Sequence, residues 1–261
     1  MLELYHNDMS TCAQKVRLAL AEKRADWKSH HLDLRARDQQ KPDYIKLNPS
    51  AVVPTLSHDG AIIVESTVIN EYIDDALEGP ALRPASASGR ARMRLWTKQL
   101  DEGLHADTGV LSTSIAFRYQ KIGKGGDEVE ALIENVPDPV KRERVRANVM
   151  EGVNSRYFRD AVLRFDRLLG RMEQALSADP WLAGAAYSLA DVAYTPYATR
   201  LDHLQLRALW DHRPHFAAWY DRIKQRDSYQ VAMVKWFNPK YLSLMEEKGR
   251  QEWPRVKAIV G

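Results

Sequence analysis

Residues 47–66 read LNPSAVVPTLSHDGAIIVES, and this stretch decides the fold of the first part of the chain. Residues 52–57 and 61–64 are rich in β-branched side chains and predict two strands. Asp59-Gly60 lies between them and predicts a tight turn, because this dipeptide tolerates positive φ angles. From Ser66 onward, apolar residues recur at helical spacing. We therefore expect a strand hairpin followed by a helix.

The residues before this stretch predict a strand–helix–strand unit. Alternating side chains indicate a strand at residues 2–5, and good helix formers fill residues 11–24. A second strand is expected at residues 30–34, and Pro42 can begin a short helix that ends at Leu47. The resulting order, β-α-β-α-β-β-α, combines a parallel βαβ unit with a hairpin and a helix packed on the sheet. This order is the thioredoxin-like arrangement, which we assign to residues 1–79.

The rest of the chain predicts a second, all-helical domain. Residues 80–88 lie in a segment rich in proline, glycine and small residues, and are the expected linker. Helical patterns dominate residues 89–261, so the fold class is α/β plus all-α. Ser188 and Asp191 form a capping-box pattern at the start of one helix. Residues 121–157 are the least readable and fit a lid, a dimer arm or a helical hairpin.

Composition excludes several classes of protein. Of 261 residues, 44% are apolar and 28% are charged, which favours a globular chain, and the net charge is only +3. The sequence has no concentrated basic stripe of the kind that nucleic-acid-binding proteins carry. The single cysteine, Cys12, excludes an intramolecular disulfide and a zinc site built on several thiolates, so no metal is expected. With neither a signal-peptide pattern nor an apolar run near ~20 residues, we expect a cytoplasmic protein without membrane contact.

The first motif that could carry chemistry is Ser10-Thr11-Cys12, at the predicted start of the first helix. A helix N-terminus has unpaired N–H groups and positive dipole, so it stabilises an anion such as a thiolate. Ser10 can donate a hydrogen bond to a bound thiolate, and a thiolate of Cys12 would benefit from the same field. The alternative is that Ser10 only caps the helix and Cys12 is a small buried hydrophobe.

Two further motifs predict backbone and head-group contacts. If the Val53–Pro54 bond is cis, the N–H and C=O of Val53 can pair with an extended peptide; the alternative is a trans proline in an edge strand. Glu65 can receive an ammonium, and Ser66 at the next helix start can hold a carboxylate. The alternative for this second pair is a simple N-cap.

Together the three motifs predict a site for a thiol, a peptide backbone and an amino-acid head. Glutathione presents these three groups. Gln39, Gln40 and Lys41 lie in a loop that could reach the glycyl carboxylate of glutathione. We therefore predict glutathione as a cosubstrate.

Several motifs then carry a resemblance over nearly the whole chain: MSTCAQKVR, LNPSAVVPTL, ESTVINEYID and YSLAD. In order and spacing they resemble the glutathione transferase superfamily, particularly its β-aryl etherase, reductive dehalogenase and zeta-like branches. The resemblance implies Ser10, with Thr11 beside it, as the thiolate-stabilising turn, and Cys12 as the counterpart of a thiol-exchange cysteine. It further implies Val53 before cis-Pro54 as the backbone partner, and Glu65 with Ser66 at the γ-glutamyl end.

Within this resemblance we expect the glutathione thiolate to attack a hydrophobic, aromatic electrophile, in conjugation or β-aryl ether cleavage. One alternative is thiol exchange, reductive dehalogenation or isomerisation through Cys12; another is a non-catalytic binding or scaffold protein. The electrophile would contact residues 96–119 and the aromatic side chains Trp236, Phe237 and Tyr241, although each aromatic alone is more often core. A homodimer is implied by resemblance only. Tyr5 is not expected to activate the thiol, because it lies in the first strand.

Overall fold

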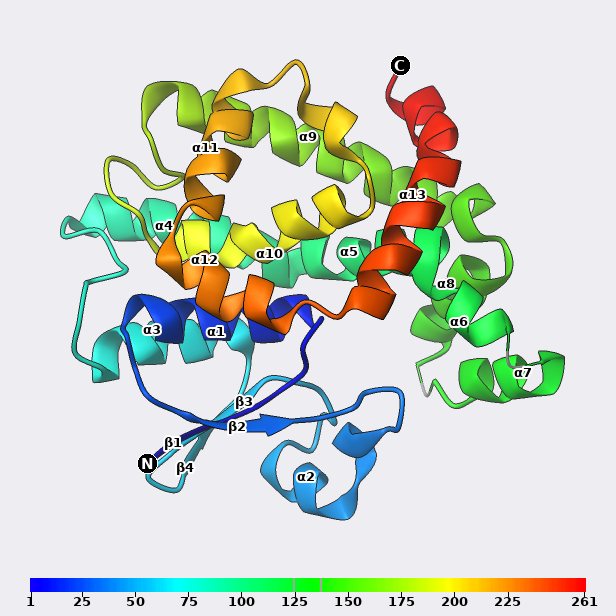
Figure 1. Cartoon of the computed structure of the whole chain (residues 1–261), viewed down its shortest axis with the longest axis horizontal. Coiled ribbons are helices and arrows are strands. Elements are labelled where there is room, and N and C mark those ends of the chain that lie inside the picture. The colour runs from blue at the N-terminus through cyan, green and yellow to red at the C-terminus, as the bar shows by residue number, and fades with distance from the viewer. Residues whose placement is uncertain (124, 137) are drawn as a thin grey trace. The chain divides into compact units, whose positions relative to one another are not determined.

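The computed structural model describes residues 1–123, 125–136 and 138–261, and Figure 1 shows their course. Lys124 and Pro137, in the stretch that the sequence left open, lie outside the described residues. The chain divides into two compact units. The first unit comprises Met1–Lys98, Ala175–Tyr197 and Ala218–Asn238, and the second comprises Gln99–Gln174, Ala198–Ala217 and Pro239–Gly261.

A four-stranded sheet in the order β2-β1-β3-β4 organises the first unit. Its strands are β1 (Leu2–His6), β2 (Lys28–His31), β3 (Thr55–His58) and β4 (Ala61–Ile63). Strand β2 runs parallel to β1, whereas β3 runs antiparallel to both β1 and β4. The mixed sheet and the helical remainder of the chain confirm the predicted fold class.

Local chemistry explains the strand boundaries. Alternate residues of β1 are buried, because successive side chains of a strand point to opposite faces. The predicted hairpin turn is present, with φ angles of 50° at Asp59 and 88° at Gly60. Strand β3 begins at Thr55 rather than at residue 52, because Pro54 has no amide hydrogen for the ladder. Strand β2 lies slightly earlier than the predicted residues 30–34.

Helices cover both faces of this sheet. Helices α1 (Thr11–Glu22) and α3 (Ser66–Ala76) pack together on one face, and α2 (Pro42–Leu47) lies on the other (Figure 1). A buried ion pair fixes the first two, since Lys23 Nζ, just after α1, lies 2.7 Å from Asp74 Oδ1 in α3. Helix α1 is buried along most of its length, so its polar residues must find partners inside the protein.

The remaining elements are helical. They are α4 (Ala87–Gln99), α5 (His105–Ser112), α6 (Tyr119–Ile122), α7 (Gly126–Glu134), α8 (Pro139–Met150), α9 (Arg156–Ala178), α10 (Leu189–His203), α11 (Pro214–Lys224), α12 (Asp227–Ala232) and α13 (Pro239–Val260). Two π-helical segments, η2 (Leu100–Leu104) and η3 (Thr113–Phe117), flank α5. Short 3₁₀ turns are η1 (Asp38–Gln40), η4 (Gly152–Asn154), η5 (Arg207–Trp210) and η6 (Val234–Trp236).

The stretch that the sequence left open contains α7 and α8, which pack against each other. Val129 and Ile133 of α7 meet Val149 of α8 in a small core of their own. Arg146 of α8 forms ion pairs with Glu130 and Glu134 of α7. Part of the charge run in α8 therefore stabilises this helical pair.

The predicted capping box begins α10 within the first unit. The Ser188 amide donates to Asp191 Oδ2 over 3.0 Å, and Ser188 Oγ accepts from the Ala190 amide over 3.3 Å. The second carboxylate oxygen, Oδ1, accepts from the Leu182 amide and from Trp219 Nε1. Burial raises the pKa of Asp191 to about 6, and the donated hydrogen bonds oppose the shift. One carboxylate thus joins a loop, a helix start and α11.

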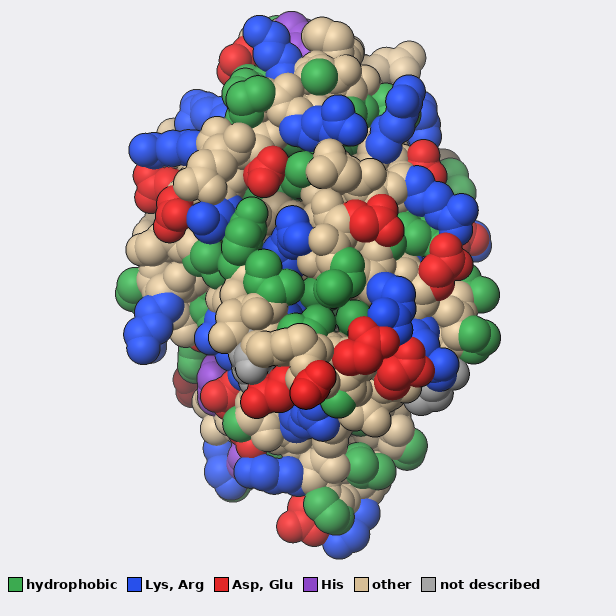
Figure 2. All heavy atoms as spheres, turned by 90° about the vertical axis from the view of Figure 1, so that its right-hand side faces the viewer, with side chains coloured by type: hydrophobic (Ala, Val, Ile, Leu, Met, Phe, Trp, Pro, Cys, Tyr) green, Lys and Arg blue, Asp and Glu red, His purple; other side chains and the backbone are tan. Residues whose placement is uncertain are grey.

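Lys and Arg side chains are interspersed with Asp and Glu over the face drawn in Figure 2, as the small net charge suggests. Among the described residues, no helix combines the length and the apolar composition needed to cross a bilayer.

We predict that Asp191→Ala lowers the free energy of unfolding much more than Ser188→Ala does. Loss of the serine cap should cost about 1 kcal/mol. Loss of the carboxylate should cost about 3 kcal/mol or more, because several buried donors lose their acceptor together. Urea unfolding of both variants measures the two losses. Equal losses would show that the contacts of Asp191 beyond the capping box contribute nothing.

Candidate functional site

The register of the sheet brings three separate segments to one edge. Tyr5 near the end of β1 pairs with Thr55 at the start of β3. Leu56 of β3 pairs with Ile63 at the end of β4. The turn before α1, the Val53–Pro54 turn and the start of α3 therefore all adjoin this edge. The three predicted motifs lie in these three segments.

Ser10 is the N-cap of α1. Its Oγ accepts a hydrogen bond from the Ala13 amide over 3.3 Å. An accepting hydroxyl keeps its own hydrogen, so Ser10 can cap the helix and still donate to a ligand. Thr11 is buried, and Cys12 is partly exposed in the first turn. The segment therefore offers a hydroxyl donor and a helix dipole to an anion.

The Val53–Pro54 peptide bond is cis. The Val52 carbonyl before it is held by Asn48 Nδ2 at 3.0 Å and by the Tyr44 hydroxyl. None of the hydrogen bonds among the described residues engages the Val53 amide or carbonyl. The turn is thus fixed from within, while Val53 keeps its backbone N–H and C=O for another chain.

Glu65 and Ser66 join β4 to α3. Glu65 has a φ of 66°, a region that non-glycine residues seldom occupy and that is often found at binding sites. Its side chain is exposed, whereas Ser66 is buried as the first residue of α3. An α-amino acid carries an ammonium and a carboxylate on one carbon. The Glu65 carboxylate suits the ammonium, and the amides at the start of α3 suit the carboxylate.

Gln39 and Gln40 lie in η1, in the loop that follows β2. The Leu32 amide at the start of this loop donates to the His6 carbonyl over 2.8 Å, so the loop leaves from the same edge of the sheet. Gln39 is partly buried, and its Oε1 has no hydrogen-bonding partner among the described residues. Lys41 is paired with Asp38 at 2.7 Å, and this contact lowers the pKa of Asp38.

Tyr5 is turned away from α1. Its ring stacks on His30 with centroids 4.3 Å apart and lies 5.9 Å from the ring of Tyr44 in α2. Helix α2 covers the face of the sheet opposite α1 (Figure 1). Tyr5 therefore belongs to the packing beneath α2.

A buried arginine holds the turn that precedes Ser10. Arg17 of α1 is 1% exposed. Its guanidinium donates to the carbonyls of Asn7, Asp8 and Ala232, each over 2.9 Å. Trp236 lies over the same group at 5.2 Å. Burial lowers the pKa of Arg17, but a guanidinium stays protonated at neutral pH. One cation thus fixes the turn before α1 and the end of α12.

His6 completes the surroundings of this guanidinium. Arg17 Nη1 lies 3.1 Å from His6 Nδ1, and because arginine only donates, Nδ1 must be the acceptor. The ring proton is then on Nε2, which lies 2.8 Å from Ser29 Oγ. Burial lowers the pKa of His6 to about 3, so the ring is neutral near pH 7. Trp236 packs edge-on against it.

A second bond ties the later part of the chain to the same turn. Asn238 Nδ2 donates to Asp8 Oδ2 over 3.0 Å, and Asp8 Oδ1 accepts from the Met9 amide over 2.7 Å. Asp8, Arg17 and Asn238 were not predicted from the sequence to take part in the site. The signal for Arg17 was available, because this charged residue stands between the apolar residues Val16 and Leu18.

The aromatic residues proposed for an electrophile have core partners. In the first unit, Trp236 packs near Trp27 with centroids 6.1 Å apart, and Trp96 packs against Tyr194 at 5.4 Å. In the second unit, Tyr241 packs against Phe117 at 5.4 Å. Trp236, Phe237 and Tyr241 all stay partly exposed. Among the described residues, no group of three or more His, Cys, Asp or Glu side chains is arranged to hold a metal.

Two family models match the chain. Residues 9–76 match the glutathione S-transferase N-terminal domain, and residues 139–222 match the glutathione S-transferase C-terminal domain. The first range contains all three predicted motifs.

Curated relatives and a solved structure agree with these matches. The chain is 29% identical to protein LigF of Sphingobium sp. strain SYK-6, with 95% of this chain and 98% of that protein covered. It is 26% identical to the tetrachloro-p-hydroquinone reductive dehalogenase of Sphingobium chlorophenolicum, with 89% and 96% covered. The crystal structure of the β-etherase LigF aligns with a TM-score of 0.77 at 28% identity, covering 90% of this chain and 99% of that one. The resemblance predicted from the sequence is confirmed.

We predict that Arg17→Lys loosens the turn before α1 specifically. An ammonium cannot reproduce the planar fork, so the amides of residues 7–10 should exchange hydrogen at least about tenfold faster than in the unsubstituted protein. Hydrogen–deuterium exchange mass spectrometry measures this change. Arg213→Lys is the matched control, since Arg213 is a buried arginine of the second unit that pairs with Asp166. Unchanged exchange in Arg17→Lys, or an equal effect of both variants, would contradict the assignment.

Proposed function

Because the chain belongs to the glutathione S-transferase family, we propose that it activates the thiol of glutathione for attack on a hydrophobic, aromatic electrophile. Family membership makes the chain a glutathione-dependent enzyme. The observation that carries the finer proposal is the sheet register, which gathers Ser10, Val53 and Glu65–Ser66 beside one edge.

In this proposal Ser10 acts on the sulfur of glutathione. A free thiol has a pKa of about 8.5, so most of it is protonated near neutral pH. The Ser10 hydroxyl donates a hydrogen bond to the thiolate, and the N-terminus of α1, with Thr11 in its first turn, adds positive potential. Both lower the pKa of the bound thiol. Arg17 holds the turn that presents Ser10 and does not touch the sulfur.

The other parts of glutathione find partners in the adjoining segments. The Val53 amide and carbonyl pair with the cysteinyl backbone, in front of cis-Pro54. Glu65 receives the γ-glutamyl ammonium, and Ser66 at the start of α3 receives its carboxylate. Gln39 and Gln40 reach toward the glycyl carboxylate from η1. The tripeptide thus lies extended along one edge of the sheet.

The reaction is a displacement at carbon. The thiolate forms a carbon–sulfur bond, while the bond from that carbon to an aryloxide or a halide breaks and the leaving group takes the electron pair. The protein supplies proximity and the lowered thiol pKa. The names of the β-etherase and the reductive dehalogenase support aromatic ethers and aromatic halides as the electrophile classes. We further propose a homodimer in the cytoplasm, on family grounds alone.

Cys12 provides a second candidate chemistry. It is partly exposed in the first turn of α1, where a thiolate is stabilised, and one relative is a reductive dehalogenase. Here the Cys12 thiolate attacks the sulfur of an aryl–glutathione adduct, the aryl carbon takes up a proton, and a Cys12–glutathione disulfide forms. A second glutathione thiolate then attacks the glutathione sulfur of this disulfide. Glutathione disulfide leaves, and the Cys12 thiolate is regenerated.

We predict that Ser10→Ala lowers kcat by about 10²- to 10³-fold with a generic aryl halide and glutathione. The pH profile of kcat should move to higher pH, because the bound thiol loses its donor. Steady-state kinetics across pH measure both effects. Ser10→Thr should restore most of the rate, and Ser188→Ala is a control that loses a helix cap away from the site. An unchanged pH profile in Ser10→Ala would contradict the assigned role.

We predict that Cys12→Ser retains turnover of aryl ethers and generic halides, because glutathione itself is the nucleophile. Turnover measured beside retention on a glutathione resin separates the two chemistries. Loss of turnover with retention intact would establish exchange through Cys12. Failure of the unsubstituted protein to bind the resin would instead favour a non-catalytic scaffold.

A further inference from the structure

A row of arginines runs along one face of α9 in the second unit. Arg164, Arg167 and Arg171 are spaced three and four residues apart, which places them on the same side of a helix. Like charges at this spacing repel, so such a row destabilises the helix unless something compensates it. The compensation inside the protein is partial, as the contacts of each guanidinium show.

Within the described residues, Arg164 is the one arginine of this row that a carboxylate holds. It forms two bonds of 2.6 Å to the buried Asp107 of α5. Arg171 donates to the neutral amide of Gln99 over 2.8 Å. Arg167 forms no ion pair within the part of the chain that the structure describes. Arg167 and Arg171 therefore have no carboxylate partner in the parts of the chain that the structure describes.

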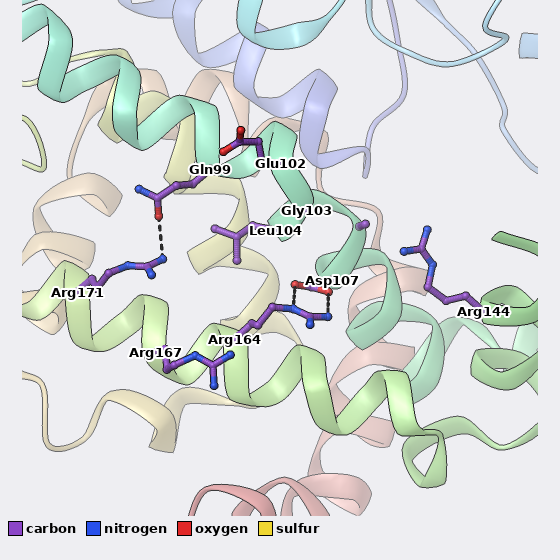
Figure 3. Close-up of a pocket in the computed structure, with 10 residues that line it drawn as sticks. Gln99, Glu102, Gly103, Leu104, Asp107, Arg144, Arg164, Arg167 and Arg171 are labelled. Carbon is purple, nitrogen blue, oxygen red and sulfur yellow. Dashed lines mark hydrogen bonds and ion pairs between the residues drawn. The ribbon is translucent and has the colours of Figure 1, made fainter. Parts of the chain in front are cut away.

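These residues line a groove with a volume of about 620 Å³. A fourth arginine, Arg144 of α8, enters it at the end away from Arg171 (Figure 3). Glu102 and Asp107 also line the groove, so four guanidinium groups outweigh two carboxylates and the lining is cationic. Small-molecule sites usually measure about 300–1,000 Å³, and this groove falls within that range.

The groove also offers apolar surface. Leu104 and Ala106 line it beside the arginines. Segment η2 forms part of this wall, and the helix is kinked at Gly103, whose φ is 145°. Guanidinium planes stack on aromatic rings and pair with carboxylates, so the lining suits an aromatic body with acidic ends.

We propose that this groove binds an aromatic dicarboxylate, with one carboxylate at Arg167 and Arg171 and the other at Arg144. The site shares no residue with the glutathione cradle and lies entirely in the second unit. A dianionic ligand reduces the repulsion between the arginines of α9. Binding is ionic at both ends and weakens as salt screens the charges.

Isothermal titration with naphthalene-2,6-dicarboxylate at low ionic strength tests the proposal. We expect saturable binding of one molecule per chain, and no binding of the neutral dimethyl ester. Arg167→Gln and Arg144→Gln should each weaken binding about tenfold, since each removes a charge-assisted contact. Arg92→Gln is the matched control, an exposed arginine of α4 outside the groove. The monoanion naphthalene-2-carboxylate should lose affinity in only one of the two groove variants.

Three results would overturn the proposal: absence of saturable binding, equal binding of the diester, or unchanged affinity in both groove variants. Glutathione affinity, measured in the same preparations, should be unaffected by Arg144→Gln and Arg167→Gln. An unchanged glutathione affinity shows that the first unit, which contains the cradle, stays folded in each variant, and an unchanged far-UV circular dichroism spectrum shows the same for the helical second unit.

Discussion

The pairing of β3 between β1 and β4 is the constraint on which the rest of the first unit depends. It aligns the end of β1, the start of β3 and the end of β4, so segments more than forty residues apart in sequence meet at one edge. A slip of one residue would also turn Leu4 and His6 out of the core and Tyr5 into it. The same register that builds the core therefore positions the proposed cradle.

The turn before α1 needs a further support, because a loop alone does not fix a hydroxyl within a few tenths of an ångström. Arg17 provides it from inside the core, where backbone carbonyls, His6 Nδ1, the charge of Asp8 and the face of Trp236 stabilise its charge. A buried cation of this kind is costly unless its donors are satisfied, so the geometry around it is tightly specified. His6 takes part as a neutral acceptor, and Asn238 adds a contact from the segment that precedes α13.

Much of this could be predicted from the sequence, because it rests on local signals. Asp59-Gly60 specifies the hairpin, Ser10 and Ser188 mark helix starts, and the order of elements limits the topology. The clamp around Arg17 could not be predicted, because its partner Ala232 is more than two hundred residues away and contributes only a carbonyl. The arginine row in α9 is visible as a spacing, but the groove depends on how α5 and α8 pack beside it. The identity of a residue does not show whether its backbone carbonyl accepts a distant hydrogen bond or which helices pack beside it.

We propose that one edge of the sheet forms a single cradle for glutathione. The most direct measurement is a crystal structure of the protein with glutathione bound. We expect the sulfur within hydrogen-bonding distance of Ser10 Oγ, the cysteinyl backbone paired with Val53, and the γ-glutamyl head at Glu65 and Ser66. A tripeptide bound away from this edge, or a sulfur directed away from Ser10, would contradict it.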